Sequence, residues 1–310
     1  MGAEAQAPAT SGSSPPSTAP PAAGAVASRV SVVVVDYDAG AVLAACVRSL
    51  RDEGVEDVVV VENGSPEAAR ALLAADVAGA PVPVVATGRN LGYGAGANRG
   101  IAATAQGDLV LVCNPDLEVH PGAVARLAAA LDGHPEWAIV GPRILDPAGD
   151  VYPSVRRFPS MVDAAGHALL APVWPDNPFS RRYRPLDAGG DVARAADWVS
   201  GACFLARRAA LEELGGFDEG YFMFAEDIDL CWRAHRAGWG VGVEPAATVT
   251  HALGVSRRRH PYRMLVAHHR SALRFAARSA TGWRRLAVPL AAVVLTGRLV
   301  LACADQLLRR

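Results

Sequence analysis

The sequence contains no lysine, so all 30 basic residues are arginine. They nearly balance the 31 acidic residues, and the formal net charge is −1 at pH 7. Such a balance creates no global basic field, so nucleic acid is not an expected partner. The distribution is uneven, because 12 arginines lie between Ser256 and Arg310, where Asp305 is the only acid. The C-terminal segment is therefore a basic extension of a mildly acidic body.

Cysteine frameworks are missing as well. The five cysteines are scattered along the chain and include no CxxC pair, which excludes the usual spacing of a zinc site. An odd, dispersed set in apolar stretches predicts buried, reduced thiols, as in a cytoplasmic protein. The N-terminus also lacks the basic and apolar regions of a secretory signal.

Large apolar side chains are almost absent from residues 1–28, which are mostly Ala, Pro, Ser, Thr and Gly. Such a segment cannot bury enough surface to offset the entropy lost on ordering, so we expect a disordered tail. In the whole chain 51% of residues are hydrophobic, which is enough for a sizeable core in the remainder.

From Arg29 onward, strand and helix patterns alternate. Runs of β-branched apolar residues predict strands buried on both faces of a parallel sheet. The expected strands are 29–37, 57–61, 82–86 and 108–113, and helices are expected at 41–53 and 66–75. This alternation predicts an α/β domain with a mostly parallel sheet. The second half is less regular, with strands expected at 138–140, 198–205 and 241–243 and an irregular loop at 153–185.

Polar groups follow several of the predicted strands. They are Tyr37-Asp38, Glu62-Asn63, the loop GRNLGYGAGANRG and Asn114-Pro115-Asp116. Ligands of an open parallel sheet bind beyond the carboxyl ends of its strands, so these groups predict a site. Each group alone is also explained as a turn, because Asp, Asn and Gly favour turns. The glycine-rich loop lacks the Rossmann spacing and follows the third strand, so on its own it is equally explained as a flexible loop.

Two residues suggest a divalent cation. Asp116 follows a buried strand in a turn containing proline, and hard cations such as Mg²⁺ take carboxylate and phosphate ligands. His251 follows another predicted strand, and histidine is a common metal ligand. Asp116 could instead cap the helix expected near Pro121, and a lone histidine is more often structural.

Three acids, Glu226, Asp227 and Asp229, begin a segment with apolar residues at helical spacing. Acids in a first helical turn complement the helix dipole, and Asp229 can pair with Arg233 four residues later. Helix physics therefore explains Asp229. The aromatic run 221–224 precedes the other two acids, and a carboxylate desolvated by aromatic rings has a raised pKa and becomes a better general base.

The basic tail contains an expected helix at 261–279 with arginines at spacing four. The following segment, 286–308, is mostly apolar, but its longest charge-free stretch, 286–297, is shorter than the roughly 20 residues that span a bilayer. We therefore expect a helix lying in the membrane interface, with its arginines toward anionic head groups. A packing or dimer helix is the alternative.

The combined motifs resemble glycosyltransferase family 2, which has the GT-A fold. The motifs are VVVVDY, VENGS, RNLGYGAGANRG, LVCNPD, WVSGACFLARR, GGFDEGYFMFAEDIDLCWR and H-x4-S, in family order between Val30 and Ser256. Within the family the chain is most similar to actinobacterial rhamnosyltransferases that act on decaprenyl-diphosphate-GlcNAc and build the linker between peptidoglycan and arabinogalactan.

The resemblance assigns a role to each matching position. Asp227 is implied as the catalytic base, and Glu226, Trp198 and Gly201 as acceptor-binding residues. Asp116 and His251 are implied as ligands of Mg²⁺ or Mn²⁺. The implied donor-binding residues are Tyr37, Glu62, Arg89, Asn90, Gly92, Asn98 and Asn114. Two positions depart from the family pattern: Asp38 stands where Asn is usual, and Glu62 stands where Asp is usual.

The implied protein is an inverting, metal-dependent transferase, with a GT-A domain at 29–256 and a membrane-associating extension at 257–310. It moves L-rhamnose from dTDP-L-rhamnose to a polyprenyl-diphosphate glycolipid as a peripheral protein at the cytoplasmic face of the plasma membrane. A UDP- or GDP-sugar donor is an open alternative, and an inactive membrane-associated binding protein is a remote one. Whether the chain forms a homo-oligomer is left open.

Overall fold

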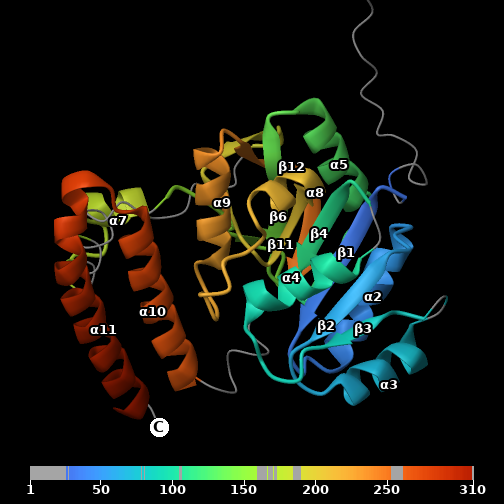
Figure 1. The fold of residues 1–310 in the computed structure, drawn as a ribbon, viewed down its shortest axis with the longest axis horizontal. Helices are drawn as coiled ribbons and strands as arrows, with labels where there is room; N and C mark the ends of the chain where they lie inside the picture. The colour runs from blue at the N-terminus through green and yellow to red at the C-terminus, as the bar shows by residue number, and fades with distance from the viewer. Residues whose placement is uncertain are drawn as a thin grey trace, which may run out of the picture.

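The computed structural model describes residues 26, 28–77, 79, 81–104, 107–158, 166, 170, 173–183, 190–252 and 261–308. Four parallel strands form its first half (Figure 1): β1 (Val30–Asp36), β2 (Val58–Glu62), β3 (Val84–Ala86) and β4 (Leu109–Cys113). The connecting helices are α2 (Ala41–Asp52), α3 (Pro66–Asp76) and α4 (Tyr93–Ala103). Every residue of β1, β2 and β4 is buried, which explains their uninterrupted apolar runs.

The second half continues the same sheet, whose strand order is β3-β2-β1-β4-β11-β6-β12-β5, with β7 paired to β6 and β9 to β12. Its strands are β5 (Leu117–Val119), β6 (Trp137–Leu145), β7 (Val151–Tyr152), β9 (Arg194–Ala196), β11 (Cys203–Arg207) and β12 (Gly240–His251). A separate pair joins β8 (Val155–Arg156) to β10 (Trp198–Val199). The predicted α/β fold with a mostly parallel central sheet is confirmed.

Helices cover both faces of the sheet (Figure 1). One buried cluster joins the sheet to α2, α3 and α5 (Ala123–Gly133). The other joins it to α4, α8 (Arg208–Glu213) and α9 (Glu226–Arg236). Four of the five cysteines are buried within these layers and all five are free thiols, as the sequence predicts.

Two predicted strands need correction. The stretch 198–205 is not one strand, because a turn at Ser200–Ala202 separates β10 from β11, which lie in different sheets. The predicted 138–140 and 241–243 are only parts of β6 and β12, which pair with each other along most of their length across an irregularity between Glu244 and Thr248. The predicted loop at 153–185 contains β8 and α7 (Pro178–Tyr183). Much of that loop, and nearly all of the predicted tail 1–28, lies outside the described residues.

The C-terminal extension forms a helical hairpin beside α9 (Figure 1). It consists of α10 (Pro261–Ser279), a short 3₁₀ helix (Gly282–Ala287) and α11 (Val288–Leu308), which has no buried residue. Within the 27-residue stretch Gly282–Leu308, an 18-residue window has a mean hydropathy of 2.1, so by length and composition this stretch could cross a membrane. The expectation that this segment is too short to span a bilayer is therefore wrong, because the helix continues through Gly297 and Arg298 and accommodates Pro289 in its first turn. The expected position of this helix in the membrane interface stays a prediction.

Candidate active site

The carboxyl ends of β1 and β2 place two acids side by side. Asp36 and Glu62 are the last residues of these strands and are paired in register. Glu62 accepts a hydrogen bond from the Gly64 backbone N–H at 2.5 Å, and Asp36 accepts one from Ala39 at 3.1 Å. Burial and the neighbouring Glu62 raise the pKa of Asp36 to about 8, so Asp36 is mostly protonated at neutral pH. The sequence interpretation gave Asp36 no role, although an acid ending a buried apolar strand was a visible signal.

The glycine-rich loop is held against this edge by side-chain amides. Asn63 accepts a hydrogen bond from Leu91 N–H at 3.2 Å and donates one to the Gly92 carbonyl at 3.4 Å. Asn90 accepts one from Gly92 N–H at 2.9 Å. Arg89 is exposed and, among the described residues, has no ion-pair partner. Its guanidinium is therefore available to an anionic ligand.

Other predicted donor-binding residues lie in different surroundings. Tyr37 is half-buried beside the end of β1. The Asn98 amide donates to the Phe217 carbonyl at 3.0 Å and to Glu219 at 3.1 Å, and its oxygen accepts from Phe217 N–H at 2.9 Å. Asn98 thus ties α4 to the loop before α9. The geometry gives it a structural task and does not test its proposed contact with a donor.

Asp116 and His251 come together through the pairing of β5 with β12. His251 Nε2 lies 3.0 Å from Asp116 Oδ1 and 3.2 Å from Asn114 Nδ2. The backbone N–H of Ala252 donates to the Asp116 carbonyl at 3.0 Å. Both side chains of the pair are about nine-tenths buried, and His251 Nδ1 has no hydrogen-bond partner among the described residues.

This pair fits a divalent cation as a partial ligand set. Among the described residues, no group of three or more His, Cys, Asp or Glu side chains is placed to hold a metal. One carboxylate and one imidazole leave most coordination positions open. Hard cations commonly fill such positions with substrate phosphate oxygens and water.

The acids of α9 follow a strained backbone. Phe224 and Ala225 have φ angles of 69° and 62°, which non-glycine residues seldom adopt and which cost about 1–3 kcal/mol each. Asp227 Oδ2 accepts a hydrogen bond from the Gly201 N–H at 2.8 Å, and Oδ1 accepts one from Ile228 at 2.8 Å. The turn that interrupts the predicted strand at 198–205 therefore holds this carboxylate.

Glu226 and Asp227 form a coupled, buried pair. Glu226 is 6% exposed, and its Oε2 has no hydrogen-bond partner among the described residues. Burial, followed by the charge of Asp227, raises the pKa of Glu226 to about 8. Burial also raises the pKa of Asp227, partly offset by the N–H groups of Gly201 and Ile228. A carboxylate of raised pKa, Asp227, therefore lies beside a carboxyl, Glu226, that keeps its proton at neutral pH.

Tyr93 links the glycine-rich helix to these acids. Its backbone N–H donates to the Phe222 carbonyl at 3.0 Å, and its hydroxyl donates to the Gly201 carbonyl. Burial raises the pKa of the Tyr93 hydroxyl well above its usual value, so the hydroxyl stays a donor. Sequence reasoning missed Tyr93, and its only signal was its position in the motif GYG.

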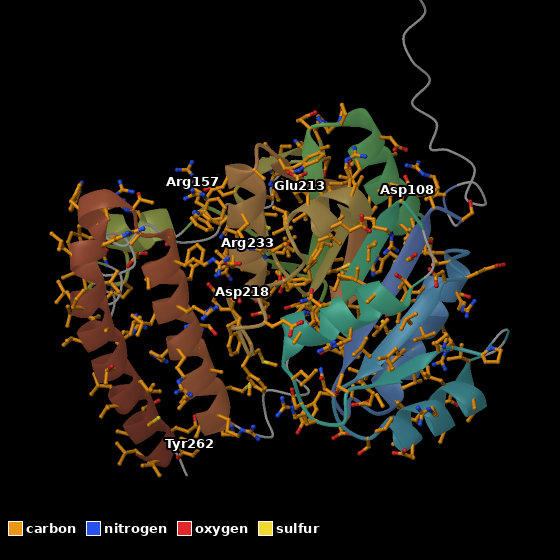
Figure 2. All side chains as sticks on the ribbon, viewed as in Figure 1. Asp108, Arg157, Glu213, Asp218, Arg233 and Tyr262 are labelled. Carbon is orange, nitrogen blue, oxygen red and sulfur yellow. The ribbon has the colours of Figure 1, made fainter. Side chains whose placement is uncertain are left out.

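Asp229 is fully buried and has a structural role. It pairs with Arg233 at 2.7 Å, as predicted, and also with Arg278 of α10 at 3.1 Å. Figure 2 labels Arg233 and Asp218 on the side of the body that faces α10. The Tyr221 hydroxyl lies 3.3 Å from Asp229. Tyr221 therefore contacts Asp229, whereas the sequence interpretation placed the aromatic run 221–224 in the pocket of Asp227.

Trp198 is buried in β10, and its indole N–H donates to the Arg157 carbonyl at 3.0 Å. The Arg156 guanidinium lies 5.6 Å from the centre of the Trp198 ring. These contacts stabilise the two-stranded β8–β10 sheet, and the proposed acceptor contact of Trp198 stays a prediction.

Comparison with known proteins supplies the family. Residues 27–283 match the family model described as "Glycosyltransferase like family 2". The chain belongs to glycosyltransferase family 2. It is 39% identical over 271 residues to the N-acetylglucosaminyl-diphospho-decaprenol L-rhamnosyltransferase of Mycobacterium tuberculosis, covering 82% of this chain and 86% of that protein. It is 28% identical to the low-salt glycan biosynthesis hexosyltransferase Agl10 of Haloferax volcanii, covering 62% of this chain and 57% of that protein.

Among solved structures, the family 2 fold resembles GalNAc-T7 with UDP, GalNAc and Mn²⁺. The TM-score is 0.53 at 18% identity, over 72% of this chain and 43% of that chain. This likeness supports the GT-A architecture alone. The predicted family, fold and enzyme class are therefore confirmed, and this family 2 protein is a glycosyltransferase. The roles of single residues stay predictions.

Proposed function

We propose that this glycosyltransferase moves L-rhamnose from dTDP-L-rhamnose to GlcNAc carried on a polyprenyl diphosphate. The observation that carries the proposal is the 39% identity to the M. tuberculosis rhamnosyltransferase over 82% of this chain and 86% of that protein. The match covers similar, large shares of the two chains. The buried acid pair at the start of α9 supports the same chemistry.

Asp227 is the proposed general base. Its carboxylate is fixed by the Gly201 and Ile228 N–H groups, and burial raises its pKa toward the range in which a base works at neutral pH. It takes the proton of the acceptor hydroxyl while that oxygen bonds to the anomeric carbon. The bond from this carbon to the phosphate oxygen of dTDP breaks on the opposite face, so a β-linked donor yields an α-rhamnoside.

Glu226 is the proposed acceptor-binding residue. Its Oε2, which has no hydrogen-bond partner in the described part of the chain, and its raised pKa leave a protonated carboxyl beside the proposed base. Such a group donates a hydrogen bond to a sugar oxygen without adding a second negative charge to the pocket. The incoming hydroxyl is thereby oriented toward Asp227.

The donor diphosphate lies beyond the ends of β1, β2 and β4 in this proposal. Arg89 pairs with a phosphate, and the buried Asp36–Glu62 pair and Asn63 hold the turn and loop against which the nucleotide binds. Asp116 and His251 would hold Mg²⁺ or Mn²⁺, which would supply positive charge to stabilise the leaving diphosphate. The enzyme acts at the cytoplasmic face of the plasma membrane, where α10 and the apolar α11 meet the lipid-linked acceptor.

A donor screen tests the proposal. Purified full-length protein, Mg²⁺ and a polyprenyl-diphosphate-GlcNAc acceptor are incubated with dTDP-L-rhamnose, UDP-GlcNAc, UDP-galactofuranose or GDP-mannose, and products are identified by mass. We expect a rhamnosylated lipid. A product formed only from a UDP- or GDP-sugar means a different donor, and neither transfer nor donor hydrolysis with any sugar means an inactive binding protein.

A single substitution tests the assignment of Asp227 as the general base. Asp227→Asn should lower kcat by about 10²–10⁴-fold, the usual contribution of general base catalysis, while dTDP binding and thermal stability are retained. Asp150→Asn, an exposed residue of the β6–β7 turn, is the matched control. Full activity of Asp227→Asn would show that another group takes the proton.

A further inference from the structure

A groove of about 1190 Å³ runs between α10 and the loop that precedes α9. Gly220 and Arg274 both line the groove and lie in close contact. A Cβ on Gly220 would lie 2.8 Å from Arg274 Nε and would overlap the guanidinium. Figure 2 shows Tyr262 near the N-terminal end of α10, at one end of this groove, and Asp218 beside the middle of the helix. The groove is open to solvent and large enough to admit a ligand.

The two walls are tied together by ion pairs and hydrogen bonds. Asp218 pairs with Arg274 at 2.9 Å and also with Arg278. Ser271 Oγ donates to the Met223 carbonyl at 2.8 Å, in the loop directly before the acids. The groove is therefore a built feature, and its shape does not depend on a ligand.

The groove carries uncompensated positive charge. Among the described residues, four arginines and no acid line it. Arg274 and Arg278 are paired with Asp218 and Asp229. Arg263 and Arg270 are exposed and have no acidic partner among the described residues. They lie seven residues, two helical turns or about 10 Å apart on one face of α10, so both guanidinium groups can reach one diphosphate.

The remaining lining is mostly apolar and adjoins the loop that precedes α9. Val266, Leu273 and Phe222 supply apolar surface between and beside the arginines. Phe222 is four residues before Glu226, and its carbonyl accepts a hydrogen bond from the Tyr93 backbone N–H. The Tyr93 hydroxyl donates to the carbonyl of Gly201, the residue whose N–H binds Asp227. When the arginines bind the charged group of a ligand, the part of the ligand next to that group therefore lies toward Glu226 and Asp227.

We propose that this groove binds the diphosphate and first isoprene units of the lipid-linked acceptor. Guanidinium groups bind phosphate oxygens through paired hydrogen bonds, which favours Arg263 and Arg270 for the diphosphate. The apolar wall accepts the prenyl chain, which continues along the hairpin toward the exposed α11. The identity of the ligand as an acceptor rests on the proposed function, whereas the affinity of the groove for a prenyl diphosphate does not.

The test measures binding of farnesyl diphosphate to the full chain by calorimetry, with saturating dTDP and Mg²⁺ present to fill the donor site. Farnesol and inorganic pyrophosphate are titrated separately. The variant R263Q/R270Q is compared with R70Q/R126Q, which removes the same charge from exposed positions of α3 and α5 on the far side of the body (Figure 1). Thermal unfolding of both variants checks that they fold.

We expect wild type and R70Q/R126Q to bind farnesyl diphosphate equally and more tightly than farnesol or pyrophosphate. R263Q/R270Q should raise the Kd by roughly 10- to 100-fold, since charge-assisted bonds to two arginines are lost. If R263Q/R270Q fails to fold, Val266→Glu, at a position already 36% exposed, places a negative charge in the groove and should weaken binding similarly. Equal affinity in all variants, or equal binding of pyrophosphate and farnesyl diphosphate, overturns the proposal.

Two further results separate the possible failures. If phosphatidylglycerol in mixed micelles displaces farnesyl diphosphate at equal phosphate concentration, the groove is a general anionic-lipid site and the commitment to a prenyl diphosphate is wrong. If wild type binds farnesyl diphosphate through the arginines but transfers no rhamnose, the groove stands and the proposed function fails. If rhamnose is transferred and R263Q/R270Q leaves the KM for the lipid acceptor unchanged, the function stands and the groove fails.

Discussion

Gly92 should be intolerant of any side chain, because the glycine-rich loop contacts the loop that leads to Glu226 and Asp227, the proposed catalytic acids. Its φ of 92° and ψ of 175° belong to a region that only glycine adopts readily. A Cβ at this position would lie 2.7 Å from the Phe222 carbonyl carbon and closer still to its oxygen. The obstacle is backbone, so it cannot move aside as a side chain would.

The cost of Gly92→Ala has two parts. The backbone conformation costs about 1–3 kcal/mol for a non-glycine residue, and the overlap with Phe222 adds about 1–3 kcal/mol, as for overpacked cores. Gly88→Ala separates them, because Gly88 also has a positive φ of 72° but no atom within 4 Å of the added Cβ. We therefore expect Gly92→Ala to be the more destabilising variant by about 1–3 kcal/mol.

Urea unfolding followed by circular dichroism measures the two free energies, and transfer assays at a temperature where both variants are folded measure activity. Gly92→Ala should lose at least about tenfold in kcat, since displacement of Phe222 moves the acids by a fraction of an ångström or more. Gly88→Ala should keep most of its activity. Equal losses of stability and activity in the two variants would refute the reasoning, because they would mean that contact with Phe222 has no effect.

Three further perturbations follow from the buried acids and the hairpin. The pKa of Glu226 rises from an unfolded value of 4.5 to about 8, so the folded protein binds this proton more tightly than the unfolded chain. The free energy of unfolding should therefore fall by at least about 1 kcal/mol as pH rises from 5 to 8. In Glu226→Gln this dependence on pH should flatten, and an unchanged slope in urea titrations would contradict the assignment. Asp229→Asn should destabilise by about 3 kcal/mol, because Arg233 and Arg278 lose a buried partner; exposed Asp150→Asn is the control, and equal midpoints for both variants would refute this. Deletion of residues 281–310 removes the apolar α11 and should weaken sedimentation with anionic vesicles, whereas unchanged partitioning would identify α11 as a packing or dimer helix.

The first half of the fold could be predicted closely because β1, β2 and β4 are buried on both faces. Their apolar runs fit no other environment, and both ends of each strand lie within one residue of the predicted bounds. The second half could not, because its elements depend on distant partners. The stretch 198–205 reads as one strand until Gly201 donates its N–H to Asp227, 26 residues later in the chain.

The sequence by itself determined the family, the alternating α/β architecture and the residues that carry the proposed chemistry. Their types and spacing are local properties, and the i, i+4 pair of Asp229 with Arg233 follows directly from helix geometry. Only the tertiary structure decided the environment of each acid. Glu226 holds its proton because packing removes it from water beside Asp227. Arg263 and Arg270 line a groove because α10 packs against the loop that precedes α9. Burial and docking are sums over contacts between segments far apart in the chain, and no local pattern contains them.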